Sequence, residues 1–429
     1  FHVDVRGFGK SEGEIGSIRK WNEAEVLDYY DTIEWAGKQA WSNGNVGLHG
    51  VSYLAIAQYY AASLNPPHLK AINPWEGVSD QYRDTCFPGG IPEVNFHVGW
   101  EVRYLNRKFD ETTLAATLDS VVNQSMLKTA PQLDKINVPA LICATWSDQG
   151  LHCRGGFEAF KRISSSHKWL YTHGRRKWEE YYSDEALKYQ KQFFDYFLKG
   201  TENGMLDTPR VRLEIRETII DYKVRDENQW PIARTEYKKL YLDSKTGSLT
   251  INEVNPARKI SYDSTSERIE FDFKFDEDTE LSGHMKLRLW VSAEDADDMD
   301  LFVGVEKLDA DGKEVYFNGM NGYLKGIVTR GWMRVSQREL DLKESTPWQP
   351  FLKHQGEQKM KPHEIVDVEI EILPSSTIFR KGEILKLTVQ GRDMITHPQT
   401  KYTRLVNNGI HSIYTGGEYD SHLLIPLIP

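Results

Sequence analysis

The chain has 429 residues, which at roughly 150 residues per domain indicates two to three domains and ample material for a buried core. It carries 53 Lys and Arg against 63 Asp and Glu, a formal charge of −10, which argues against nucleic-acid binding because that affinity comes from cationic side chains. Three cysteines without CxxC spacing argue against a disulfide scaffold and a cysteine-based zinc site, and no apolar run reaches the roughly 18 residues of a membrane span.

The first part of the chain alternates short apolar runs with helical periods, a pattern that predicts a parallel sheet with helices on its faces. Because the chain starts without Met and inside an apolar run, we expect an upstream segment to be missing, and a signal peptide cannot be assessed. Strands are expected at residues 3–5, 45–50, 69–72, 140–145 and 169–172, and helices at residues 23–41 (with Asn22 as N-cap), 53–64 and 184–198.

The alternation lapses between residues 76 and 135. A loop is expected at residues 86–92, and helical patterns occur at residues 94–108 and 112–127. We interpret this insertion as a helical cap over the C-terminal edge of the sheet.

Alternating apolar and polar residues with few helix signals dominate the chain from residue 211 onward, which predicts an all-β jelly roll or sandwich. We therefore expect an α/β domain at residues 1–205 and a jelly-roll domain at residues 206–429. Strands are expected at residues 286–290, 301–305, 314–317, 369–373 and 384–389, with a hairpin turn at residues 309–312.

The sharpest chemical signal is Gly50-Val51-Ser52-Tyr53, which lies between a predicted strand and a predicted helix. A serine on such a turn projects its Oγ clear of the sheet, and the next amide N–H lies at the positive end of the helix, where it can stabilise an oxyanion. The usual nucleophile elbow has a second Gly two residues after the serine, where this chain has Leu54.

A nucleophilic serine needs a base and an orienting carboxylate, in the chain order Ser, acid, His on an α/β sheet. Asp148 follows the strand at 140–145 and His173 follows the strand at 169–172, so both should lie at the same sheet edge as Ser52. His152 and His167 are rival bases. We expect His152, four residues past Asp148, to form a surface i, i+4 pair, and His167 to lie at the opposite strand end.

No His-Glu-x-x-His run or phosphate-binding loop occurs, and we expect neither a metal nor a cofactor. The acidic run at residues 294–300 lacks the spacing of a calcium loop, and we expect it to be a solvated sheet edge.

These motifs, with others along the chain, resemble the CocE/NonD serine hydrolases, the group of the cocaine esterases, α-amino-acid ester hydrolases and X-Pro dipeptidyl-peptidases. The resemblance runs from the first residue nearly to the last. It rests on Asp-Val-Arg-Gly at residues 4–7, residues 11–13 and 39–47, Gly50-Val51-Ser52-Tyr53, residues 67–72, Trp146-Ser147-Asp148, His173, and residues 226–234, 345–347, 374–379 and 414–421.

The resemblance implies an α/β-hydrolase domain with a cap, followed by a jelly roll beside the active site. By position, Ser52 would be the nucleophile, Asp148 the acid, His173 the base and Tyr53 the backbone oxyanion donor, while Ala55 stands where the family often has Gly. The family's second oxyanion donor is a tyrosine hydroxyl from an upstream segment, which we expect to be missing here together with the first strands of the sheet.

We therefore expect a serine hydrolase that cleaves a small acyl ester through an acyl-enzyme, with Trp75, Trp146 and Trp178 lining the substrate pocket. An X-Pro dipeptidyl-peptidase remains the close alternative, since Asp84, Glu93 or Glu179 could anchor a free amine. A non-catalytic protein that binds a carbohydrate or a partner through the jelly roll is the alternative of another class.

The expected partner is a small ester or a short peptide, with neither nucleic acid nor membrane. The oligomeric state is open, with a homo-oligomer among the expectations, and three scattered cysteines make the cytoplasm the default location.

Overall fold

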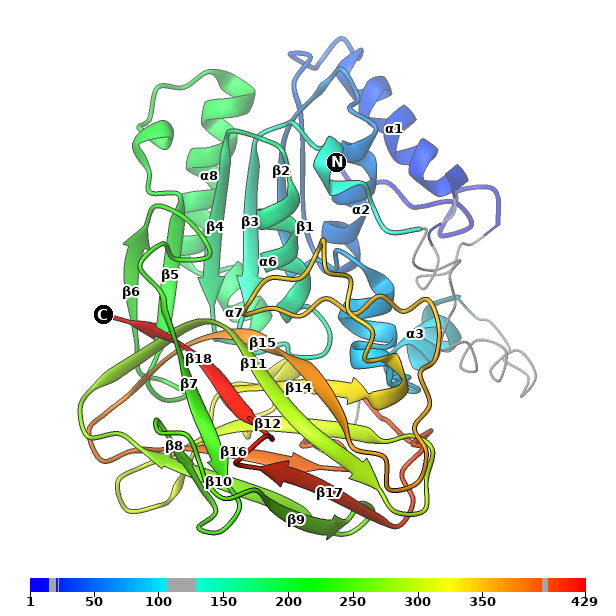
Figure 1. The fold of residues 1–429 in the computed structure, drawn as a ribbon. Coiled ribbons are helices and arrows are strands. Elements are labelled where there is room, and N and C mark those ends of the chain that lie inside the picture. The colour runs from blue at the N-terminus through cyan, green and yellow to red at the C-terminus, as the bar shows by residue number, and fades with distance from the viewer. Residues whose placement is uncertain (15–20, 22, 106–128, 396–399) are drawn as a thin grey trace.

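The computed structural model describes residues 1–14, 21, 23–105, 129–395 and 400–429, and it shows an α/β part above a strand-rich part in the view of Figure 1. The α/β part contains a parallel sheet in the order β1-β2-β3-β4-β5, with β6 antiparallel to β5. The expected strands in this part are therefore confirmed from residue 46 onward. The strands are β1 (Val46–Val51), β2 (Leu69–Trp75), β3 (Ala140–Thr145), β4 (Lys168–His173), β5 (Val211–Arg216) and β6 (Tyr222–Glu227).

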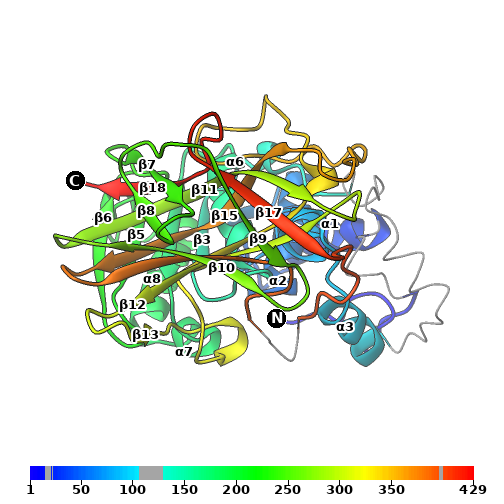
Figure 2. The ribbon, with the colours of Figure 1, turned by 60° about the horizontal axis from the view of Figure 1, so that its bottom comes forward.

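Helices cover both faces of this sheet, as the alternating pattern predicts. Ile142 of β3 packs in a core cluster with residues of α2 and α6, whereas its neighbour Leu141 packs with Phe193 of α8, because successive strand residues point to opposite faces. Figure 2 shows α6 and α8 on opposite sides of β3. No helix in the described ranges combines the length and apolar character needed to cross a bilayer. The helices are α1 (Glu23–Gly37), α2 (Tyr53–Ser63), α6 (Cys153–Arg162), α7 (Lys177–Tyr181) and α8 (Asp184–Lys199).

The strand expected at residues 3–5 is absent. This segment is irregular, and Val3 is 54% exposed. A strand needs a neighbour to accept and donate its ladder hydrogen bonds, and the ladder of β1 in the described residues runs to β2. The expected N-cap Asn22 and the helix expected at residues 112–127 lie outside the described residues.

The described part of the insertion packs against the β part. The helix expected at residues 94–108 is confirmed as α3 (Phe96–Leu105), and the expected loop contains the short 3₁₀ helix Pro88–Gly90. Val94 N donates to Lys401 O at 2.9 Å, and Lys401 N donates to a Glu93 carboxylate oxygen at 3.0 Å. The role of the insertion as a cap stays a prediction.

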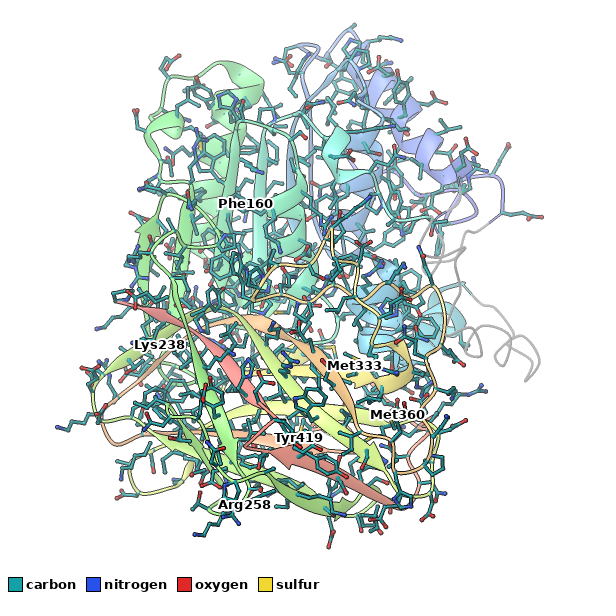
Figure 3. The ribbon with its side chains drawn as sticks, in the orientation of Figure 1. Phe160, Lys238, Arg258, Met333, Met360 and Tyr419 are labelled. Atoms are coloured by element: carbon teal, nitrogen blue, oxygen red, sulfur yellow. The ribbon has the colours of Figure 1, made fainter. Side chains whose placement is uncertain are left out.

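The C-terminal half consists of mainly antiparallel strands around a large apolar core, so the expected β class is confirmed while the jelly-roll topology stays a prediction. Figure 3 labels Met333 and Met360 in this part, and both belong to its core. The hairpin turn expected at residues 309–312 connects β12 to β13. The strands are β7 (Glu236–Asp243), β8 (Ser248–Thr250), β9 (Arg258–Asp263), β10 (Arg268–Lys274), β11 (Thr279–Ala293), β12 (Asp300–Leu308), β13 (Glu314–Val315), β14 (Thr329–Arg334), β15 (Val366–Phe379), β16 (Ile384–Gln390), β17 (Ile410–Thr415) and β18 (His422–Ile428).

The two parts share one continuous hydrogen-bonded sheet. β5 and β6 extend the parallel sheet past residue 206, and β5 meets β15 through the pair Arg216 and Thr377. The division at residue 205 stays a prediction, and the structure places strands of the later segment in the α/β sheet.

The acidic run at residues 294–300 is only partly solvated, contrary to expectation. Asp298 and Asp300 are buried, and Arg334 donates to both oxygens of Asp300 at 2.8 Å. Asp298 accepts from the amide of Ser336 at 2.8 Å, so both buried carboxylates of the run form hydrogen bonds within the β part.

Candidate active site

Ser52 lies on a sharp turn between β1 and α2, as the Gly50-Val51-Ser52-Tyr53 motif predicts. Its φ of 61° is unusual for a residue with a side chain, and its amide donates to Trp75 O on β2 at 3.0 Å. A Cβ on Gly50 would lie 2.5 Å from the Leu54 Cβ, so the glycine makes room for the leucine that stands in place of the elbow's second Gly. The turn thus presents the serine at the C-terminal edge of the sheet.

The imidazole of His152 faces Ser52. The Ser52 Oγ lies 3.0 Å from His152 Nε2, and His152 Nδ1 lies 2.5 Å from Asp148 Oδ2. The turn after β3 builds this geometry, because Asp148 O accepts the His152 amide at 2.9 Å and so brings the two side chains together. His152 and Asp148 are each 2% exposed, so they form a buried pair and not the surface pair expected from their spacing.

His173 does not face Ser52, contrary to the expectation that it does. It is the last residue of β4 and is fully buried, and its Nε2 lies 3.1 Å from Glu76 Oε1. A side chain still on the strand lies within the packed layer, whereas His152 follows a turn that reaches over the sheet edge. The i, i+4 spacing after Asp148, in the chain order Ser, Asp, His, is the sequence signal that could have indicated His152.

A positively charged side chain, that of Lys177, lies beside the carboxylates of Asp148 and Glu76. Lys177 of α7 donates from Nζ to Asp148 Oδ2 at 2.8 Å, and the same Nζ lies 3.4 Å from Glu76 Oε2. Burial and the Lys177 ammonium lower the pKa of His152, against the pull of Asp148. Burial opposes ionisation of Asp148, but Lys177 and His152 hold the pKa of that carboxyl far below its usual range. His152 is therefore neutral and Asp148 charged near neutral pH, as a general base and its orienting carboxylate must be.

Tyr53 is the first residue of α2, so its amide N–H has no acceptor within the helix and lies beside the Ser52 hydroxyl. This is the position from which a backbone donor could bind an oxyanion. The Tyr53 side chain points to other partners, since its hydroxyl donates to Glu25 and its ring stacks on Trp21.

Two of the three tryptophans expected in the pocket are core residues. Trp75 donates from its indole N–H to Asn73 at 3.1 Å, and Trp146 stacks on Phe157; neither exposes more than 1% of its surface. Trp178 on α7 is 57% exposed, and its place in a pocket stays a prediction.

The carboxylates considered as amine anchors have other partners. Asp84 accepts from Arg154 at 2.9 Å, and Glu93 accepts from the amide of Phe96 at 2.9 Å. Glu179 is exposed and pairs with Arg176 at 3.3 Å.

Among the described residues, one group of side chains has the spacing of a metal site, namely Glu76, Asp148 and His152, whose ligand atoms lie within 4.8 Å of one another. The Lys177 ammonium lies 2.8 Å from Asp148, 3.1 Å from His152 Nδ1 and 3.4 Å from Glu76. It fills the place that a cation would take, so these residues do not fit a metal.

The β part holds the loop that carries Asp148. Arg330 of β14 donates to Gln149 O at 2.6 Å, and Gln149 Nε2 donates to Val328 O at 3.0 Å. The position of the carboxylate therefore depends on both parts of the molecule.

Known proteins match this chain over nearly its whole length. Residues 1–131 match the X-Pro dipeptidyl-peptidase (S15 family), and residues 203–424 match the X-Pro dipeptidyl-peptidase C-terminal non-catalytic domain. The chain is 44% identical to a CocE/NonD family hydrolase from Staphylococcus aureus, whose crystal structure superposes with a TM-score of 0.95 and covers 99% of this chain and 78% of that one.

Two further relatives are more distant. Cocaine esterase from Rhodococcus sp. (strain MB1 Bresler) is 25% identical, and the match covers 99% of this chain and 87% of that protein. An aminopeptidase from a marine sediment Thaumarchaeota archaeon is 16% identical with a TM-score of 0.75, covering 99% of this chain and 85% of that one, and supports the fold alone.

Proposed function

Because this chain belongs to the CocE/NonD family of serine hydrolases, we propose that it cleaves small acyl esters through a catalytic triad of Ser52, His152 and Asp148. The observation that carries the proposal is the continuous hydrogen-bonded path from Ser52 Oγ through His152 to Asp148, with steps of 3.0 Å and 2.5 Å. Nucleophile, base and orienting carboxylate in contact are the arrangement that acyl transfer requires.

The proposed reaction uses these contacts in order. In the tautomer that donates from Nδ1 to Asp148, the His152 Nε2 is free to take the Ser52 proton as Oγ attacks the substrate carbonyl carbon. The Tyr53 amide binds the developing oxyanion. His152 then gives the proton to the leaving alcohol, and an acyl-enzyme forms on Ser52. The same imidazole deprotonates a water molecule that attacks the acyl carbonyl, and it then returns this proton to Ser52 Oγ as the bond to the acid breaks.

Chemical labelling and matched histidine variants test this proposal. A fluorophosphonate probe followed by peptide mapping should label Ser52, and Ser52→Ala should abolish the labelling. His152→Gln should lower kcat for p-nitrophenyl acetate by about 10⁶-fold, because no base remains. His173→Gln, at an equally buried histidine, should retain most of kcat per labelled site. If His173→Gln lost more kcat than His152→Gln, His173 and not His152 would be the base.

A dipeptidyl-peptidase is the alternative that the S15 match makes worth testing. The engagement of Asp84 and Glu93 with other partners favours an ester without a free amine. Faster turnover of an Ala-Pro anilide than of p-nitrophenyl acetate would reverse this preference. Hydrolysis that persists in Ser52→Ala would favour the non-catalytic alternative for this site.

A further inference from the structure

Two buried carboxylates lie side by side next to the triad. Glu76 is 1% exposed and Asp148 is 2% exposed, and Glu76 follows β2 with a φ of 49°, a conformation that residues with side chains rarely adopt. Two neighbouring carboxylates in a buried site cannot both stay ionised without a cation, because like charges disfavour ionisation. A strained backbone and a buried charge both lower stability, so we ask which neighbouring group stabilises the Glu76 carboxylate.

Lys177 supplies that cation. Its side chain is 10% exposed, and its Nζ contacts Asp148 Oδ2 at 2.8 Å and Glu76 Oε2 at 3.4 Å. Asp148 Oδ2 is also the oxygen that meets His152 Nδ1, so the ammonium and the imidazole share one acceptor atom. The same Nζ lies 3.1 Å from His152 Nδ1.

We propose that Lys177 is a positioning residue that fixes the Asp148 carboxylate toward His152 and sets the pH range in which His152 acts as a base. This inference rests on the proposed triad and adds a fourth charged group to it. Lys177 acts through Asp148 and His152 and has no contact with the reacting atoms in the proposed reaction.

Each element around His152 contributes an identified group. Asp148 approaches from the turn after β3, Glu76 from the end of β2, Lys177 from α7 and the Ser52 hydroxyl from the elbow. His173, at the end of β4, faces Glu76. The two carboxylates favour the imidazolium and the ammonium opposes it, which agrees with the lowered pKa of His152.

The sign of the effect follows from these charges. Removing the ammonium favours the imidazolium, so His152 should take up its proton at a higher pH and the acid limb of the rate profile should move upward. Removing the Glu76 charge should do the opposite. A side chain with a merely structural role would change the rate without moving the limb in these opposite directions.

The test is the pH profile of kcat/KM for p-nitrophenyl acetate. In Lys177→Met the midpoint of the acid limb should rise by about one pH unit, and in Glu76→Gln it should fall. Lys177→Arg keeps the charge and should keep the limb near its wild-type position. Lys307→Met is the matched control, since Lys307 is a buried lysine that pairs with Glu383 at 2.8 Å in the β part, and its profile should stay unchanged.

The outcomes separate this inference from the proposed function. If Ser52 labels and Ser52→Ala is inactive, but Lys177→Met and Glu76→Gln both keep the wild-type limb, then the role of Lys177 is refuted and the triad stands. If Ser52→Ala remains active, the proposed function itself fails. If Lys177→Met does not fold, Glu76→Gln and Lys177→Arg decide alone, and an unmoved limb in Glu76→Gln refutes the inference.

Discussion

The histidines of this protein show how far the role of one side chain depends on its surroundings. His152 lies in the turn after β3 and His173 is the last residue of β4, and both are buried, yet His152 contacts Ser52 and Asp148 while His173 contacts Glu76. The sequence placed both near the correct sheet edge. It could not distinguish them, because the choice depends on a hydrogen bond between residues 100 positions apart.

A third histidine ties stability to pH. His411 on β17 is fully buried against Tyr262, neither ring nitrogen has a partner among the described residues, and burial lowers its pKa from 6.5 to about 4. Between about pH 4 and pH 6.5, the imidazole of His411 is therefore protonated in the unfolded chain and neutral in the folded protein. This group's contribution to stability is present above pH 6.5 and is lost as the pH falls toward 4.

We expect His411→Phe to flatten this dependence. Over that pH interval the wild-type free energy of unfolding should fall by about 3 kcal/mol more than that of the variant, at about 1.36 kcal/mol for each unit of pKa. Urea unfolding above pH 6.5 and near pH 4 measures both values. His2→Gln, at an exposed histidine, is the control and should behave as wild type. Equal pH dependence in His411→Phe and wild type would contradict the assignment.

At the scale of elements, α6 positions His152, the proposed base. The helix begins at Cys153, directly after His152, and two glycines let it approach the sheet. A Cβ on Gly155 would lie 2.3 Å from Gly77 O, and one on Gly156 would lie 2.8 Å from the Ala144 Cβ. The alternating pattern predicts helices on the faces of the sheet, but only the packing shows that Gly156 brings this helix close to β3 and that Gly155 brings it close to the segment after β2.

Gly155→Ala should therefore push α6 away from the backbone of the segment that follows β2 and displace His152. We expect a loss of about 1–3 kcal/mol in the free energy of unfolding, because overpacking a close contact forces the backbone to shift. We also expect a lower kcat per site labelled by the fluorophosphonate. Gly99→Ala on α3 is the matched control, because no atom of the described residues lies within 4 Å of its added Cβ and alanine favours a helix. Wild-type kcat and stability in Gly155→Ala would show that α6 does not set the position of the base.

At the scale of the whole molecule, hydrogen bonds connect the β part to the loop of the proposed active site. Arg330 donates to Gln149 O at 2.6 Å and to Asp393 at 3.0 Å, and Gln149 is the neighbour of Asp148. Composition and alternation predicted a β domain in the C-terminal half. They could not predict that its strands hold the loop that carries Asp148, because that contact spans 181 positions.

Arg330→Leu should lower kcat by about 10–100-fold by loosening this loop, since small misplacements of catalytic groups are costly. The measurement is kcat per labelled Ser52, with thermal unfolding followed in parallel to confirm a folded protein. Arg288→Leu is the control and should leave kcat unchanged. Arg288 lies on β11 and pairs with Asp367 of β15 at 3.2 Å. An equal effect of the two variants would rule out a specific role for Arg330.

The sequence by itself determined the strands of the α/β part between residues 46 and 173, the elbow with Ser52, the position of Asp148 after β3 and the family. Each of these is encoded within a few neighbouring residues, through apolar periodicity and turn chemistry. The tertiary structure decided that His152 contacts Ser52, that Trp75 and Trp146 are core residues, and that Lys177 lies between two carboxylates. These contacts join residues that are far apart in the sequence. They depend on strand order, register and helix packing, which bring the side chains together in space.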